Sequence, residues 1–241
     1  MARPGARLTA DDPRAIQQLF DEVAPTYDVL NRVLSVGNDQ RLRRRTAQLI
    51  SPEPGGTVVD ICGGTGDLAL AVADRHPKCR VQLADFSAEM LRLAQPKIAA
   101  RASGERITLT AADACCLPVA DGACDGVTAG FGFRNLKSVQ AGLAEAHRVL
   151  KPGGRLAIIE FFRPEGWLAP VKSLAFHTAV PAIAWCIAPA RAGAYAYLAG
   201  SIMRFLSTTE MSELMREVGF TDIELHPTML GVITIIGATR A

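Results

Sequence analysis

Residues 57–67 read TVVDICGGTGD, and this stretch decides the fold. Its first six positions form a short, largely apolar and β-branched run, and glycines follow at positions 63, 64 and 66. Glycine lets the backbone turn sharply and approach a ligand closely at the carboxyl end of a strand. The stretch therefore predicts a strand, a glycine loop and then a helix over 67–76, with a tight turn that binds nothing as the alternative.

The same alternation continues toward the carboxyl terminus. Short apolar runs predict strands, and the segments between them carry apolar residues at helical spacing. Strands that alternate with helices indicate a parallel sheet covered on both faces, and we expect the last two strands to pair antiparallel. The predicted strands are residues 57–62, 80–86, 107–113, 124–131, 155–161, 221–229 and 232–239, and the predicted helices are 67–76, 87–100, 139–150 and 211–220.

Seven strands in this order predict a Rossmann-like α/β fold with a mostly parallel sheet, in a single domain over residues 1–241. Two segments lie outside the sheet, namely N-terminal helices over 1–50 and a helical, substrate-side insertion over 163–207. Ser87 is expected to cap the helix that follows it. Residues 150–154, LKPGG, predict the end of one helix and a tight turn into the next strand.

The composition limits the class of protein. Hydrophobic residues make up 49% of the chain, which excludes wholesale disorder. The chain carries 26 Lys and Arg against 24 Asp and Glu, a net charge of +2, so we expect no nucleic-acid partner. The 6 cysteines form no CxxC pair, and we expect no metal site. The first residues lack the apolar run of a secretory signal, which favours a cytoplasmic protein.

Acidic residues stand at the ends of three successive predicted strands. Asp60 is near the end of the first, Asp85 is near the end of the second, nineteen residues beyond Gly66, and Asp113 ends the third. In nucleotide-binding folds of this kind, a carboxylate after the second strand accepts the ribose hydroxyls. We therefore expect Asp85 to bind a ribose and Asp113 to accept a hydrogen bond from an adenine amino group.

The glycine loop favours a cationic nucleoside over a dinucleotide. Loops that bind NAD follow the pattern GxGxxG and hold a pyrophosphate at the helix N-terminus. This chain lacks that spacing, and Asp67 stands in the first helical turn, where it would repel a phosphate. S-adenosylmethionine carries a sulfonium and an ammonium group and no phosphate, so Asp60 and Asp67 suit it better. The residues together predict a class I, S-adenosylmethionine-dependent methyltransferase.

Longer stretches resemble one methyltransferase family in particular. The stretches VAPTYDVLNRVLSVG (23–37), VVDICGGTGDLAL (58–70), AGFGFRNL (129–136) and HRVLKPGGRLAIIEF (147–161) are similar to the ubiquinone/menaquinone biosynthesis C-methyltransferase family. The likeness extends over residues 15–240, and its most specific pieces are YDxxNxxxS at 27–35 and FGxRN at 131–135.

The resemblance implies a reaction and a set of site residues. The reaction is methyl transfer from S-adenosylmethionine to a ring carbon of a prenylated quinol, with demethylmenaquinol as the expected substrate. Tyr27, Arg134 and Asn135 stand where the family places substrate-facing polar groups. The expected cofactor-contact positions are Asp60, Gly63, Gly64, Thr65, Gly66, Asp85, Phe86, Asp113, Ala114 and Gly130.

At four positions the chain departs from the family pattern. Asp39 and Leu42 replace a His and a Trp, Phe162 replaces a Ser after the fifth strand, and Gly130 replaces a frequent Ser. Two alternatives therefore stay open. One is a methyltransferase that acts on a free hydroxynaphthoquinone or an aromatic polyketide. The other is an accessory protein that keeps the fold but does not catalyse methyl transfer. The intact glycine loop argues against this second alternative.

The chemistry of ring methylation suggests roles for the substrate-facing side chains. A quinol carbon becomes nucleophilic once a phenolic proton leaves, so the protein must orient the ring and stabilise the phenolate. Arg134 stays protonated and is not the base, so we expect it to stabilise the phenolate while Asn135 orients the ring oxygen. The alternative for Arg134 is an ion pair that holds a loop. Tyr27 is expected to relay a proton or pack over the cofactor, and His177 is a second candidate base.

Residues 173–190 carry no Asp, Glu, Lys or Arg over eighteen positions. This length reaches the lower limit for a membrane-spanning helix, but Pro181 and Pro189 interrupt the segment. We expect instead a lid or groove wall that binds an isoprenoid tail, with packing against the sheet as the alternative. The residues at helical spacing are Leu174, Phe176, Val180, Ile183, Ala184 and Ile187.

Charged and apolar surfaces indicate further partners. Arg41, Arg43, Arg44 and Arg45 predict a solvated helix face, with a contact to anionic lipid as the alternative. Peripheral contact with the inner face of a membrane and a homodimer both stay open at this point.

Overall fold

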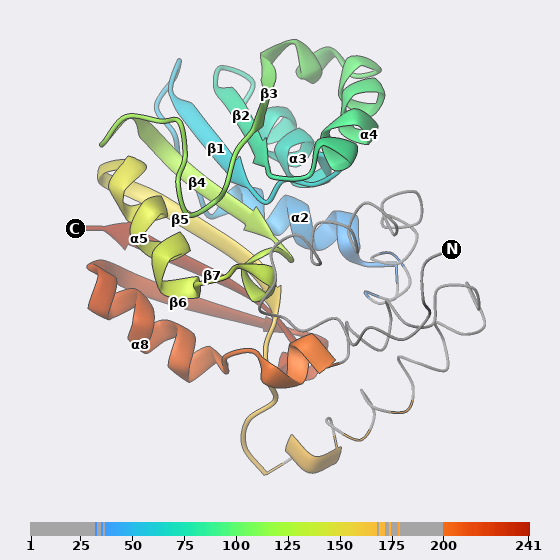
Figure 1. Cartoon of the computed structure of the whole chain (residues 1–241), viewed down its shortest axis with the longest axis vertical. Coiled ribbons are helices and arrows are strands. Elements are labelled where there is room, and N and C mark those ends of the chain that lie inside the picture. Colours follow the sequence, from blue (N-terminus) through green and yellow to red (C-terminus); the bar gives the residue numbers. More distant parts are fainter. Residues whose placement is uncertain are drawn as a thin grey trace, which may run out of the picture.

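The computed structural model describes residues 37–167 and 200–241, together with positions 32, 35, 169–171, 174 and 178. Within these residues, seven strands form one sheet in the order β3-β2-β1-β4-β5-β7-β6 (Figure 1). This mixed, mostly parallel sheet confirms the predicted fold class. The strands are β1 Thr57–Ile61, β2 Arg80–Asp85, β3 Ile107–Ala111, β4 Cys124–Gly130, β5 Leu150–Phe161, β6 Phe220–Thr228 and β7 Ile233–Arg240.

The strand order reverses at β1, which has β2 on one side and β4 on the other. Both pairings are parallel, and Val59 lies in register with Gln82 and with Val127. Strand β7 runs antiparallel between β5 and β6, as predicted for the final pair. In open parallel sheets, ligands bind beyond the carboxyl ends of the strands where the order reverses. The loops that follow β1 and β4 therefore mark the expected position of a site.

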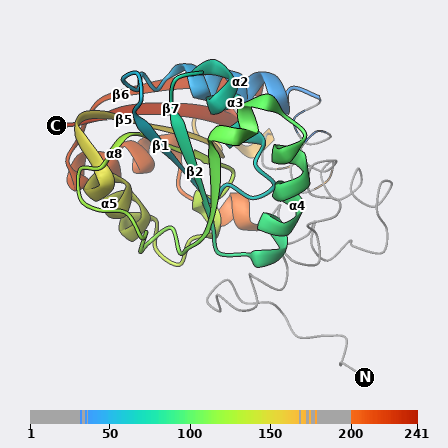
Figure 2. The same cartoon turned by 90° about the horizontal axis from the view of Figure 1, so that it is seen from above.

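Helices cover both faces of the sheet (Figure 2). On one face, α2, α3 and α4 bury an apolar core that includes Leu68 and Ile98 against Val81 and Leu83 of β2. On the other face, α5 and α8 contact each other and pack on β4 and β5. The helices are α2 Asp39–Gln48, α3 Asp67–Arg75, α4 Ala88–Ala99, α5 Val139–Val149 and α8 Thr208–Val218.

Serine side chains cap the start of three of these helices, with Ser138 capping α5. The Ser87 hydroxyl accepts a hydrogen bond from the Met90 amide, which confirms the predicted cap of α4. Helix α8 begins at Thr208, because Ser207 and Glu210 form a reciprocal capping box. It ends before Gly219, whose φ of 110° is left-handed. The span predicted for this helix, 211–220, is therefore wrong at both ends.

The turn predicted over residues 150–154 lies inside β5 and not before it. Cys124 pairs with Leu150 and Gly126 pairs with Arg155, so β5 has three more residues than β4 over this interval. Gly153 has a φ of 77°, which the turn requires. The turn chemistry was predicted correctly, but the strand extends to residue 150 because the chain pairs with β4 on both sides of the bulge.

The two segments predicted outside the sheet are described only in part. Helix α2 belongs to the N-terminal segment, and residues 163–167 and 200–207 belong to the insertion. The prediction of a single domain with N-terminal helices and a helical insertion therefore stays a prediction. In the part of the chain that the structure describes, no helix is both long and apolar enough to cross a membrane. Most of the apolar run 173–190 lies outside the described residues.

Candidate functional site

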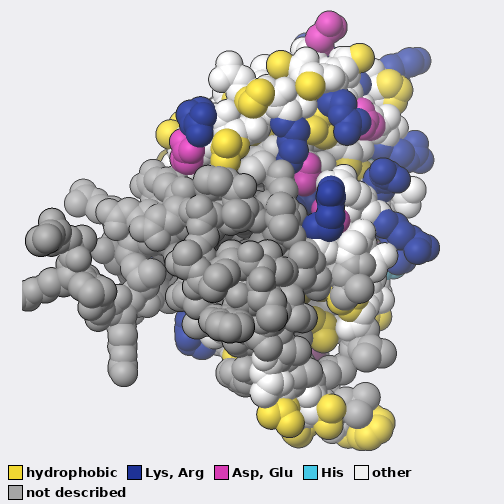
Figure 3. Space-filling model, turned by 90° about the vertical axis from the view of Figure 1, so that its right-hand side faces the viewer, with side chains coloured by type: hydrophobic (Ala, Val, Ile, Leu, Met, Phe, Trp, Pro, Cys, Tyr) yellow, Lys and Arg dark blue, Asp and Glu magenta, His cyan; other side chains and the backbone are white. Residues whose placement is uncertain are grey.

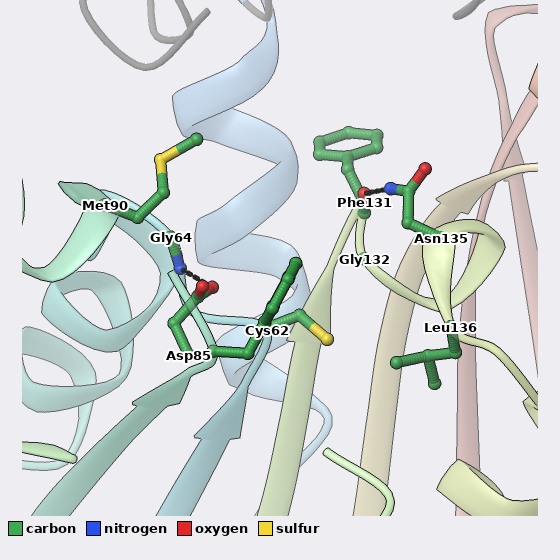
Figure 4. Close-up of a pocket in the computed structure, with 9 residues that line it drawn as sticks. Cys62, Gly64, Asp85, Met90, Phe131, Gly132, Asn135 and Leu136 are labelled. Atoms are coloured by element: carbon green, nitrogen blue, oxygen red, sulfur yellow. Dashed lines mark hydrogen bonds between the residues drawn. The ribbon is translucent and has the colours of Figure 1, made fainter. Parts of the chain in front are cut away.

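The loops after β1 and β4 border a cavity at the carboxyl edge of the sheet (Figure 4). Its position is the one expected from the reversal of strand order. The cavity measures about 40 Å³ and is partly open to solvent, so a ligand of nucleoside size would extend beyond it. The cavity is lined by Cys62, Gly64, Asp85, Phe86, Met90, Phe131, Gly132, Asn135 and Leu136.

Asp85 joins the glycine loop to the start of α4. Its Oδ2 atom accepts a hydrogen bond of 2.8 Å from the Gly64 amide, and its Oδ1 atom accepts one of 2.9 Å from the Ser87 amide. The carboxylate is 6% exposed and lines the cavity. Because hydrogen bonds to a carboxylate are stronger than neutral ones, this residue holds the loop in a defined position beside the cavity.

The carboxyl ends of β1 and β4 approach so closely that a side chain is excluded between them. A Cβ atom on Gly132 would lie 2.3 Å from the Cβ atom of Cys62, which is shorter than any allowed contact. Cys62 and Phe131 themselves have φ values of 53° and 60°. Left-handed backbone at non-glycine residues is strained and is found most often at functional sites. The strain here lies directly in the cavity wall.

Asp60 lies beneath the glycine loop rather than on the cavity wall. Its Oδ1 atom accepts a hydrogen bond of 2.7 Å from the Thr128 hydroxyl, and its Oδ2 atom has no hydrogen-bond partner among the described residues. Burial raises the pKa of Asp60 to about 7, although the Thr128 hydrogen bond and the charge of Arg43 both lower it. A buried carboxylate with an unpartnered oxygen is the kind of group that a nearby cation stabilises.

The other predicted cofactor residues fall into two groups. Phe86 is 38% exposed and lines the cavity, and Gly63 and Gly66 belong to the loop around Gly64. Thr65, Asp113, Ala114 and Gly130 do not line the enclosed cavity. Of these, Asp113 is exposed and accepts a hydrogen bond of 2.8 Å from the Cys115 amide. Contact between these residues and a cofactor stays a prediction.

Arg134 and Glu160 form a buried ion pair beside the cavity. Their closest atoms are 2.6 Å apart, and the two side chains are 4% and 0% exposed. Arg134 also donates a 2.6 Å hydrogen bond to the Phe131 carbonyl. Burial raises the pKa of Glu160, although the charge of Arg134 lowers it. This geometry matches the alternative given above for Arg134, an ion pair that holds a loop, and Arg134 does not line the enclosed cavity.

Asn135 is the predicted substrate-facing residue that reaches the cavity. Figure 4 shows its side chain beside Phe131, whose carbonyl accepts a 3.4 Å hydrogen bond from the Asn135 amide nitrogen. Tyr27 and His177 lie outside the described residues.

Arg43 was missed, because the sequence predicted a solvated helix face for it. The prediction holds for Arg41, Arg44 and Arg45, which are exposed, but Arg43 is 4% exposed. Asp67, expected to face a cationic ligand, lies 3.9 Å from the Arg43 Nε atom and 2.6 Å from the Lys97 Nζ atom. A signal was present, since the buried positions 39, 42, 43, 46, 47 and 50 follow the helical period.

Three of the departures from the family pattern lie in packed positions. Leu42 is 4% exposed and packs with Phe131 and Phe161, and Phe162 is fully buried with its ring centre 5.7 Å from that of Phe205. Asp39 is 2% exposed, with Oδ1 3.9 Å from the Arg32 Nε atom.

The residues around the cavity fit S-adenosylmethionine. Asp85 brings a buried carboxylate to the cavity wall, and Asp60 places a second carboxyl group beneath the loop, so the site carries the acidic groups that a cationic ligand needs. A Cβ atom on Gly63 would lie 2.5 Å from Leu83 Cγ, so the loop packs closely on β2 and only glycine fits at this position. Among the described residues, no group of three or more His, Cys, Asp or Glu could hold a metal ion.

Comparison with known proteins identifies the family. A model of the ubiE/COQ5 methyltransferase family matches residues 8–240. A ubiquinone/menaquinone biosynthesis C-methyltransferase UbiE of Geotalea daltonii is 39% identical over 222 residues, which cover 91% of this chain and 94% of that protein. A demethylmenaquinone methyltransferase of Deinococcus radiodurans is 39% identical over 219 residues, which cover 90% of each chain.

Solved structures confirm the fold. Haemonchus contortus phosphoethanolamine N-methyltransferase 2, in complex with S-adenosyl-L-methionine, aligns with a TM-score of 0.67 over 93% of this chain and 60% of its own, at 16% identity. The predicted resemblance, enzyme class and cofactor are thereby confirmed, and the protein is an S-adenosylmethionine-dependent C-methyltransferase. The chain belongs to the ubiE/COQ5 methyltransferase family.

Proposed function

We propose that the enzyme methylates a ring carbon of a prenylated quinol, with demethylmenaquinol as its substrate. The observation that carries this proposal is the 39% identity, along nine-tenths of the chain, to relatives named for this reaction. The cavity supports it, because Phe86, Met90, Phe131 and Leu136 offer apolar and aromatic surface to a flat ring, and Asn135 offers a polar amide.

Asn135 orients the ring, and Arg134 positions Asn135. The Asn135 amide can donate a hydrogen bond to a quinol oxygen, which favours the phenolate that makes the adjacent carbon nucleophilic. Arg134 reaches the same strained segment through the Phe131 carbonyl, which accepts hydrogen bonds from both side chains. The Arg134 Nη1 atom already donates to Glu160 and to the Phe131 carbonyl, and Arg134 does not line the cavity, so in this proposal it acts through Asn135. Tyr27 and His177, outside the described residues, are the proposed proton carriers.

Asp85 and the glycine loop hold the cofactor in this proposal. S-adenosylmethionine supplies the electrophilic methyl group when it is bound. Asp85 accepts from the ribose, and Phe86 and Met90 pack against the nucleoside. The remaining proposed contacts are Asp60, Gly63, Gly64, Thr65, Gly66, Asp113, Ala114 and Gly130.

An apolar tip on the insertion supports a membrane contact. Trp167, Val171 and Leu174, called here the apolar tip, are 87%, 64% and 65% exposed. Figure 3 shows hydrophobic side chains gathered at the lower end of the molecule, where Figure 1 places this segment. Exposed Trp with aliphatic neighbours is typical of segments that lie at a membrane interface. We propose that the apolar tip enters the inner face of the bilayer that holds the prenylated substrate, and a homodimer that buries the same residues is the alternative.

The substrate is tested by transfer of a radiolabelled methyl group from S-adenosylmethionine. We expect kcat/KM for demethylmenaquinol to exceed that for an unprenylated naphthoquinol by at least about a hundredfold, because each buried CH₂ of the tail contributes roughly 0.8 kcal/mol. Equal values would support the polyketide or free naphthoquinone alternative. Cofactor binding without methylation of either ring would point to an accessory protein.

Replacing Asp85 should weaken cofactor binding. Asp85→Asn removes the charge and places an amide nitrogen beside one of the two backbone donors, so the affinity for S-adenosylmethionine should fall by about 1.5–3 kcal/mol. Isothermal titration measures this. Asp74→Asn, at an exposed position of α3, is the control and should leave the affinity unchanged. An Asp85→Asn protein with normal affinity would show that Asp85 only anchors the loop.

Replacing Arg134 should lower both the stability of the protein and its kcat. A second substitution at Glu160 should distinguish the two effects. Arg134→Met leaves Glu160 buried without its cation, so we expect the free energy of unfolding to fall by about 3–5 kcal/mol. Adding Glu160→Gln should restore part of the melting temperature. If Arg134 also positions Asn135, kcat stays low in the double variant, whereas recovery of kcat together with stability would reduce Arg134 to a structural role. Arg92→Met, in the exposed pair with Glu89, is the stability control.

The apolar tip is tested with vesicles that contain anionic lipid. The triple variant Trp167→Ser, Val171→Ser, Leu174→Ser should lose most of its co-sedimentation and show a raised KM for prenylated quinol embedded in the vesicles. Leu225→Ser, at a 44% exposed position of β6, is the matched control. Unchanged binding together with a change from dimer to monomer in the triple variant would favour the homodimer.

A further inference from the structure

A groove lies on the layer of helices formed by α2, α3 and α4, apart from the cavity beside the glycine loop. It measures about 500 Å³. Sites for small ligands commonly measure about 300–1,000 Å³, so this groove has the size of a binding site. We call it the basic groove, because its lining includes Arg32, Arg44, Arg75, Lys97 and Arg101.

Three helices supply the lining of the basic groove. On α2, Gln40, Arg44 and Gln48 follow one another at four-residue intervals and therefore share one face of the helix. On α3, the buried side chain of Leu70 belongs to the lining, and α4 contributes Lys97. The groove thus combines buried apolar surface with side chains that donate hydrogen bonds.

Positive charge in the basic groove exceeds negative charge. Five Lys and Arg line it against two acids, Asp67 and Asp74, which leaves an excess of three positive charges. Asp67 is already paired, since its Oδ1 atom lies 2.6 Å from the Lys97 Nζ atom. Like charges that line one groove repel one another, and a bound anion would relieve this repulsion.

Three of these arginines lack an acidic partner. Arg44, Arg75 and Arg101 are exposed, and none of them forms an ion pair with a residue that the structure describes. Figure 3 shows Lys and Arg side chains gathered on the side of the molecule to which α2 and α4 belong. Arg75 lies in the last turn of α3, where the helix dipole favours a cation, but Arg44 lies in the middle of α2. The helix dipoles therefore do not account for the cluster.

We propose that the basic groove binds a phosphate-bearing anion. Guanidinium groups present paired N–H donors that match the oxygens of a phosphate. A phosphate monoester or a diphosphate also carries more negative charge than a carboxylate, which suits an excess of three positive charges. Gln40 and Gln48 add neutral donors on the same wall as Arg44. This site lies outside the methyl-transfer reaction, and it rests neither on the quinol substrate nor on the apolar tip.

Two sources offer this chemistry. One is a soluble phosphate or diphosphate compound. The other is the headgroup of an anionic phospholipid, because basic protein surfaces are attracted to anionic membranes. The probes for the two sources are inorganic pyrophosphate and vesicles of phosphatidylglycerol mixed with phosphatidylcholine.

The groove variant Arg44→Gln, Arg75→Gln, Arg101→Gln tests the site. It removes three exposed charges and keeps Lys97, which supports the glycine loop through a 3.2 Å hydrogen bond to the Thr65 hydroxyl. Isothermal titration should show that its affinity for pyrophosphate is lower than that of the unaltered protein by about tenfold or more, because charge-assisted hydrogen bonds are lost.

Two further variants separate the groove from general surface charge. The control Arg41→Gln, Arg45→Gln, Arg216→Gln removes three exposed charges that do not line the groove, and it should keep the affinity of the unaltered protein. Asp74→Asn removes an acid from the groove and should bind pyrophosphate about two- to fivefold more tightly. Such a gain does not arise from a damaged fold.

Co-sedimentation with the vesicles identifies the source. A loss in the groove variant that the control variant does not show supports a lipid headgroup. Weaker pyrophosphate binding in the groove variant, with equal vesicle binding of the two variants, supports a soluble phosphate. The proposal is overturned if the groove variant binds both probes as the control variant does. The apolar tip variant should bind pyrophosphate normally, so a failure of the proposed membrane contact is told apart from a failure of this site.

Discussion

The arrangement of the site depends on one carboxylate with two backbone donors. Asp85 accepts from the amides of Gly64 and Ser87, which belong to the glycine loop and to the N-cap of α4. At the other end of α4, Lys97 adds a hydrogen bond to the Thr65 hydroxyl of the same loop. Because Asp85 also lines the cavity, the group that fixes the loop is itself part of the cavity wall. Its position at the end of β2 follows from parallel pairing, which brings successive strand ends to one edge.

Two buried arginines flank the aromatic pair that supports the opposite wall. Phe131 and Phe161 have ring centres 5.1 Å apart, with Arg43 over the first ring and Arg134 over the second. Each arginine also has an acidic partner, Asp67 for Arg43 and Glu160 for Arg134. Phe131 is held in left-handed backbone, and its carbonyl accepts from Arg134. The strained segment is thus fixed by ionic, aromatic and hydrogen-bonding contacts from α2, β5 and its own loop.

The sequence predicted the sheet well because strand patterns and the glycine loop are local. The succession of strands along the chain, the Ser87 cap and the antiparallel final pair could be predicted from local patterns and the general rules for α/β sheets. The start of α8 was misplaced because Ser207 precedes the apolar part of that helix by several residues. Glu160 was not recognised as the partner of Arg134 because 26 residues separate them, and only the folded sheet brings them together. Arg43 was predicted to be exposed because it is charged. Its position in the helical period of the buried residues already indicated that it faces the interior.

The packing of Leu42 suggests how sequence changes near this site act. The family resemblance places a Trp at this position, and the smaller Leu42 packs with Phe131 and Phe161 instead of lining the cavity. A change in its size would act on a ligand only by moving Phe131, whose ring does line the cavity. Phe131 is held by its strained backbone, by Arg43 and by Arg134, so it resists such movement. The departure at Leu42 is therefore absorbed by the apolar cluster, and it leaves the polar side chains of the cavity wall, Asp85 and Asn135, in place.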